Sequence, residues 1–94
     1  MKLSLEDKHY QILMDILQKY PYHFYAFGSR VKGNARKLSD LDIAVDNEIS
    51  INDLANLEED FTESDIPFKV DIISLNEIPP SFYKIIEKDL VKIK

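Results

Sequence analysis

The stretch FGSRVKGNARKLSDLDIAV, residues 27–45, is the part of the sequence around which the rest of the chain is organised. It contains both glycines of the chain, Gly28 and Gly33, and four of its twelve basic residues. No acid occurs from Gly28 to Ser39, and two aspartates then follow at alternate positions, Asp40 and Asp42. A flexible basic loop that leads into paired carboxylates suits an anion bound together with a hard cation, such as a nucleoside triphosphate with Mg²⁺.

The apolar pattern on both sides of this stretch predicts alternating helices and strands. Short runs rich in aromatic and β-branched residues predict strands at residues 22–27, 41–45 and 68–74, with a short edge strand at 90–93. Apolar residues at three- and four-residue steps predict helices at residues 4–19, 50–64 and from 79 onward. Ser4 and Ser50, each followed three residues later by an aspartate, predict helix caps. We expect an α/β (α+β) fold, with a small mixed three- to four-stranded sheet flanked by helices.

Length and composition limit the classes of protein to which the chain can belong. Its 94 residues suffice for one small domain, so residues 1–94 are predicted to form a single unit. The chain has no cysteine, which excludes disulfides and thiolate chemistry. Its net charge of −5 disfavours direct DNA binding. No signal peptide or membrane-spanning stretch is evident, so we expect a cytoplasmic protein with no membrane association.

Three aspartates are the candidate catalytic and metal-binding residues. Asp40 and Asp42 are two residues apart at the start of a strand, so both carboxylates should share one face. Asp71 lies within the apolar strand 68–74, where a carboxylate is costly without a partner. If the three converge, they can hold two Mg²⁺ ions about 3.5–4 Å apart, the arrangement used for nucleotidyl transfer. The alternative is that Asp40 is a turn residue and that Asp42 and Asp71 face water.

Gly28, Ser29 and Arg30 are the candidate nucleotide-binding residues. A glycine lets the main chain approach a phosphate closely, and a hydroxyl with successive N–H groups can bind its oxygens. For Gly28 and Asp40 to share one site, the strands 22–27 and 41–45 must be antiparallel neighbours. The alternative is that Gly28 and Ser29 form only a simple turn and bind no phosphate. A Walker A loop is rejected because Asn34 and Ala35 replace its required lysine and hydroxyl residue.

The combination of Gly28-Ser29, Asp40-Leu41-Asp42 and a later Asp71 resembles the nucleotidyltransferase superfamily that includes DNA polymerase beta. The compact forms G-S-R and S-D-L-D are similar to its minimal nucleotidyltransferases, and the resemblance covers nearly the whole chain. It implies Mg²⁺ at the three aspartates, phosphate binding at Gly28 and Ser29, and ATP or another nucleoside triphosphate as substrate.

The resemblance also implies partners. Small members of this family commonly pair with a helical protein of the HEPN type, and some are antitoxins that add AMP to a tyrosine of that toxic partner. We therefore expect Mg²⁺-dependent transfer of a nucleoside monophosphate, with AMP implied, to a hydroxyl of a protein or small molecule. The alternative is a non-catalytic antitoxin that inhibits its partner by association. Oligomer formation is left open, and apolar surface is expected around Phe61 or Phe82.

Overall fold

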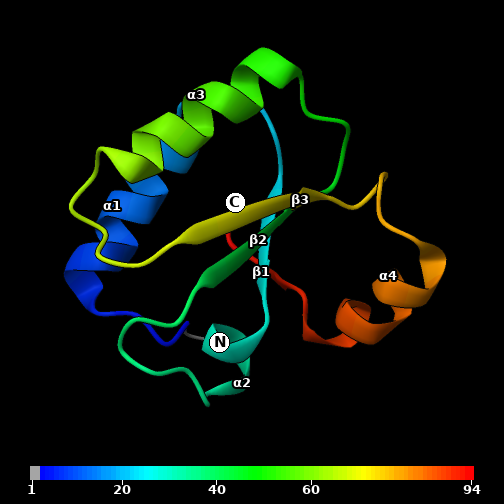
Figure 1. The fold of residues 1–94 in the computed structure, drawn as a ribbon, viewed down its shortest axis with the longest axis horizontal. Coiled ribbons are helices and arrows are strands. Elements are labelled where there is room, and N and C mark those ends of the chain that lie inside the picture. Colours follow the sequence, from blue (N-terminus) through cyan, green and yellow to red (C-terminus); the bar gives the residue numbers. More distant parts are fainter. Residues whose placement is uncertain (1–2) are drawn as a thin grey trace.

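Four strands form one mixed sheet in the computed structural model, which describes residues 3–94 (Figure 1). The strands are β1 (Phe24–Phe27), β2 (Leu41–Val45), β3 (Val70–Ser74) and β4 (Val91–Lys92). The helices are α1 (Asp7–Leu17), α2 (Ser29–Lys32), α3 (Ile51–Thr62) and α4 (Pro80–Ile86), followed by a 3₁₀ turn, η1 (Glu87–Asp89). The strand order is β3-β2-β1-β4, with β1 antiparallel to β2 and β4, and β2 parallel to β3. The predicted mixed sheet with flanking helices is confirmed.

One face of the sheet carries the main hydrophobic core. Because strand side chains alternate between faces, Phe24 of β1 and Leu41, Ile43 and Val45 of β2 all point to this side. Helices α1 and α3 lie together over it, as Figure 1 shows. Leu13 and Leu17 of α1 and Leu57 of α3 complete a group of fully buried side chains. Burial of this apolar surface is the dominant favourable contribution to folding.

The opposite face of the sheet is covered only in part. Its buried cluster consists of Phe27, Ala44 and Ile86, the last contributed by the short helix α4. In Figure 1, α4 lies to one side of the strands, away from α1 and α3. Phe82 and Ile85 of α4 remain 38% and 64% exposed, whereas Phe61 of α3 is buried in the main core. Of the two predicted apolar surfaces, the one around Phe82 is therefore confirmed and the one around Phe61 is wrong.

The two predicted helix caps have different outcomes. The Ser50 side chain accepts a hydrogen bond from the Asp53 N–H at 3.0 Å, as expected for the start of α3. The Ser4 cap is wrong, because α1 begins at Asp7 and its N-cap residue, Glu6, makes no side-chain capping bond. Ser4 instead presents its carbonyl oxygen to Arg30, so the segment before α1 is held by the central loop.

Candidate active site

Two of the predicted acids lie directly opposite each other on neighbouring strands. Asp42 of β2 is in register with Asp71 of β3, and because these strands are parallel both side chains point to the sparsely covered face. Asp40 is in the chain one residue before β2 begins. On its other side Asp42 is in register with Phe27, the last residue of β1, so Gly28 follows immediately beside it. The predicted antiparallel pairing of β1 and β2 is confirmed, and it brings the glycine to the acids.

The electrostatics of Asp42 reflect crowding of like charges. Burial of the carboxyl group raises the pKa of Asp42, and the neighbouring carboxylates of Asp71 and Asp40 raise it further. The negative charges of Asp71 and Asp40 disfavour ionisation of Asp42. A bound cation would neutralise this repulsion. These three acids therefore act electrostatically on one another, although Asp40 is exposed and Asp42 and Asp71 are half-buried.

A lysine already pairs with one of the acids. Lys69 Nζ lies 3.1 Å from Asp71 Oδ1, and this ion pair raises the pKa of Lys69. Residues 69 and 71 are two apart on one extended segment, so their side chains share the sparsely covered face of the sheet. Lys69 is not among the predicted site residues, and its spacing of two from Asp71 is the signal in the sequence that identifies it.

The acids suit a hard divalent cation chemically, since Mg²⁺ prefers carboxylate oxygens. Within residues 3–94, however, no group of three or more His, Cys, Asp or Glu side chains is gathered closely enough to form a ready-made metal site. The carboxylates of Asp40, Asp42 and Asp71 repel one another when no cation neutralises them, and Lys69 already pairs with Asp71. The prediction of Mg²⁺ at Asp40, Asp42 and Asp71 thus stays a prediction.

Gly28 fits its position because a larger residue would collide with Asp42. Its φ of +84° lies in the left-handed region, which disfavours side chains, and a Cβ added there would overlap Asp42 Oδ2. The Gly28 carbonyl accepts the N–H groups of Val31 and Lys32 at 3.0 and 3.1 Å, which starts α2. Ser29, the first residue of α2, is half-buried beside this junction. The main chain at Gly28 therefore lies against the carboxylate that is predicted to bind metal.

Arg30 has a different environment from the one expected of a nucleotide contact. It is only 4% exposed, and its guanidinium group donates to three carbonyl oxygens, of Ser39, Ser4 and Lys37. The same group lies 3.9 Å above the ring of Phe68. Burial lowers the pKa of Arg30, and the carboxylate of Asp40 opposes this shift. These contacts favour a positioning role, in which Arg30 holds the loop that ends at Asp40.

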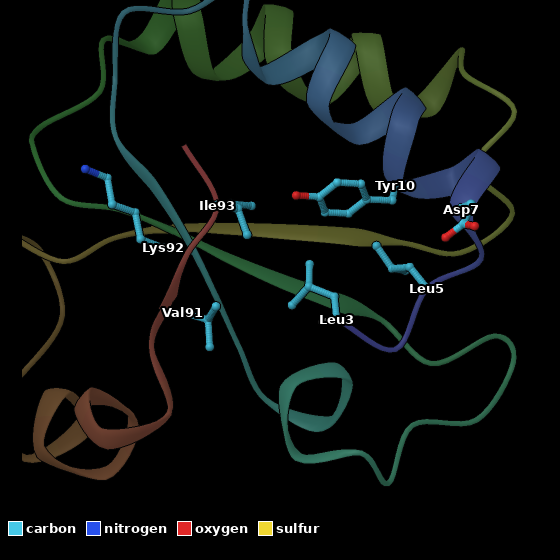
Figure 2. Close-up of a pocket in the computed structure, with 7 residues that line it drawn as sticks. All are labelled: Leu3, Leu5, Asp7, Tyr10, Val91, Lys92 and Ile93. Carbon is cyan, nitrogen blue, oxygen red and sulfur yellow. The ribbon is translucent and has the colours of Figure 1, made fainter. Parts of the chain in front are cut away.

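A separate hollow lies at the other edge of the sheet. It has a volume of about 200 Å³ and lies between the segment before α1, helix α1 itself and β4 (Figure 2). Figure 2 shows Tyr10 and Ile93 pointing toward each other across this hollow. None of the predicted site residues lines it. The described part of the chain also has no helix both long and apolar enough to cross a membrane.

Comparison with known proteins agrees with this geometry. A family model described as polymerase beta, nucleotidyltransferase, matches residues 11–93, and the chain belongs to this family of nucleotidyltransferase enzymes. Within it, the chain is similar to a Haemophilus influenzae protein named "Probable protein adenylyltransferase MntA". The two are 40% identical over 97 residues, a match that covers 99% of this chain and 85% of the relative.

Proposed function

We propose that this nucleotidyltransferase is a Mg²⁺-dependent protein adenylyltransferase, which transfers AMP from ATP to a hydroxyl group of a partner protein. The observation that carries the proposal is the register of Asp42 with Asp71, next to the close approach of Gly28. The name of the Haemophilus relative supports the choice of AMP and of a protein acceptor. The further proposal is that the partner is a HEPN-type helical toxin and that this chain is its cytoplasmic antitoxin.

The proposed reaction is an in-line displacement at the α-phosphorus of ATP. The acceptor oxygen forms a bond to that phosphorus, the bond to the bridging oxygen of the β-phosphate breaks, and pyrophosphate leaves. The carboxylate of Asp71 accepts the proton of the attacking hydroxyl. Asp40, Asp42 and Asp71 would hold two Mg²⁺ ions, which would neutralise the phosphates and lower the pKa of the hydroxyl.

Gly28 and Ser29 are proposed to bind the triphosphate. The main chain at Gly28 has no side chain to keep a phosphate at a distance, and Ser29 offers both a hydroxyl and an N–H group. Arg30 is proposed to act through the loop, because its donors are already bonded to main-chain oxygens. This loop carries further basic residues at its exposed surface, Arg36 and Lys37, which are available to attract a polyanion.

Labelled ATP tests the proposal directly. The chain is incubated with Mg²⁺, a HEPN-type helical protein as the proposed partner, and ATP labelled either at the α- or at the γ-phosphorus. Label from the α-position alone should become covalently attached to a hydroxyl residue of the partner. Attachment of γ-label would indicate phosphorylation and contradict the proposal. A partner inhibited in a stable complex without any labelling would instead support the non-catalytic antitoxin.

Asp71→Asn separates catalysis from nucleotide binding. Because Asp71 is on a different strand from the residues beside Gly28, its loss should lower kcat far more than ATP affinity. We expect a fall in kcat of at least about 100-fold, within the usual range for removal of a group that acts in proton transfer. Equal losses in rate and in ATP affinity would indicate that Asp71 only helps to hold the nucleotide.

A further inference from the structure

The outer edge of β3 has main-chain groups that no other strand of the described chain bonds. β3 is the last strand of the sheet on its side. The Leu41 N–H donates to Lys69 O, and the Leu75 N–H donates to Val45 O. Residues at odd positions from 69 to 75 therefore direct their main chain toward β2, because residues alternate in a parallel ladder. By the same alternation, Val70 and Ile72 direct their N–H and C=O groups away from the sheet.

Two hollows lie along this edge. One, of about 270 Å³, lies at the start of β3, and the other, of about 280 Å³, lies at its end. Each is lined by consecutive residues that point to opposite faces of the strand, Lys69 with Val70 and Ile72 with Ile73. The hollows therefore extend across the edge and are not confined to one face. Apolar side chains form part of the lining of each hollow, Phe61 and Ile66 in the first and Ile49 and Leu54 in the second.

A strand added at this edge would reach the catalytic acids. Asp71 is the second residue of the five-residue edge strand β3 and points to the sparsely covered face. Residues opposite each other on paired strands have Cβ atoms about 4.5–5.5 Å apart, and side chains of diagonal neighbours remain within reach when they are long or aromatic. A serine or threonine opposite Asp71, or a tyrosine two residues along on the same face, would thus present its hydroxyl to that carboxylate.

We propose that the acceptor protein binds as an extended segment that pairs with the outer edge of β3 and so presents its hydroxyl residue beside Asp71. This inference rests on the proposed function, because it concerns the acceptor of that same reaction. Main-chain hydrogen bonds to Val70 and Ile72 would bind the segment in any sequence, and the two hollows would accept its apolar side chains.

Charge at the edge favours a foreign segment over a second copy of this chain. Glu77 is the charged residue that lines the second hollow, so a basic residue at that end of the bound segment would be complementary, whereas Glu58 and Lys69 both line the first hollow and offset each other. A second copy would bring more acid to this edge, since the net charge of the chain is −5. Lys69, an exposed lysine beside the edge, further discourages pairing between identical edges.

Amide hydrogen exchange, followed by NMR, tests this inference. The ¹⁵N-labelled chain is compared alone and in complex with the protein that becomes labelled in the transfer experiment, with Mg²⁺ and a non-hydrolysable ATP analogue present. We expect the amides of Val70 and Ile72 to exchange at least tenfold more slowly in the complex. The amides of Asp71 and Ile73 are matched controls, because they face β2 and should change little.

A synthetic chain that is N-methylated at Ile72 provides a second measurement. It lacks one outward donor but keeps the side chain, and circular dichroism checks that it folds. We expect KM for the acceptor protein to rise at least tenfold, with KM for ATP unchanged.

Three outcomes would overturn the inference. Transfer to a protein without slowed exchange at Val70 and Ile72 would overturn it and leave the proposed function in place. If the amides of Val70 and Ile72 exchange more slowly in the chain alone as its concentration rises, the edge of β3 pairs with a second copy of the chain. A failure to label any protein would remove the proposed function and this inference together.

Discussion

The two faces of the sheet differ in what their side chains do. On the face toward α1 and α3, Leu41, Ile43 and Val45 of β2 are fully buried. On the opposite face, Asp42 of the same strand is half-buried among like charges, and only a small apolar cluster lies beyond it. Because side chains alternate along β2, one face of this five-residue strand contributes to the core and the other contributes Asp42 to the proposed site. Removing a side chain from the first face should affect stability, and removing one from the second should affect activity.

The largest expected effect is on catalysis. Asp40→Asn combined with Asp42→Asn should lower AMP transfer by at least about 1,000-fold, equivalent to about 4 kcal/mol of activation free energy. The reason is that the charge needed to hold Mg²⁺ is lost while the shape of each side chain is kept. Transfer is measured with α-labelled ATP and stability by urea unfolding. Undiminished transfer by a well-folded double variant would contradict the assignment of these residues.

The next effect is on the core, and the two faces can be compared directly. Leu41→Ala removes a fully buried side chain beneath α1 and α3 and should cost about 3–4 kcal/mol of unfolding free energy. Ile86→Ala, beneath the short helix α4, should cost about 2 kcal/mol, because its thin surroundings can relax into the space left behind. Urea unfolding measures both. Equal costs would show that the second face is as tightly packed as the first.

The two glycines provide a smaller comparison within the central loop. Both have positive φ, +84° for Gly28 and +85° for Gly33, so alanine is strained at either position. Gly33→Ala meets no atom within 4 Å and should cost about 1 kcal/mol, whereas Gly28→Ala also displaces the Asp42 carboxylate and should cost about 2–3 kcal/mol. Only Gly28→Ala should also weaken ATP binding. A Gly28→Ala variant with normal ATP binding would argue against close approach of phosphate there.

The smallest effect is the pH dependence of stability. The folded state raises the pKa of Asp42 above its ordinary 3.8, so folding favours the protonated form. This group therefore makes the chain less stable as the pH rises from its unfolded pKa through its folded pKa. Asp42→Asn should be more stable than the wild type by about 0.5 kcal/mol at pH 7, a size typical of partly exposed charges, and equal to it near pH 3. Unfolding curves at both pH values test this, and a difference independent of pH would contradict it.

Most of the fold could be predicted from local sequence pattern. The strand at residues 41–45 was predicted with its observed bounds, because Gly28 and the polar loop separate two short apolar runs. Ser50 was identified as a cap because a capping bond spans only three residues. The buried environment of Arg30 could not be predicted from the sequence. Its partners Ser4 and Phe68 are 26 and 38 residues away, and only the folded chain brings them together. For the same reason the burial of Phe61 could not be read from its helix alone.

The central claim is that Asp40, Asp42 and Asp71 form one cation-dependent site on the sparsely covered face. Mn²⁺, which accepts the same carboxylate ligands as Mg²⁺, broadens the NMR signals of nearby amides, so it reports where the ion binds without any need for turnover. We predict selective broadening at Gly28, Asp42 and Asp71 of the wild type, and none at these residues in Asp42→Asn. The acidic run of α3, from Glu58 to Asp60, is the internal control. Broadening centred on α3, or unchanged by Asp42→Asn, would contradict the claim.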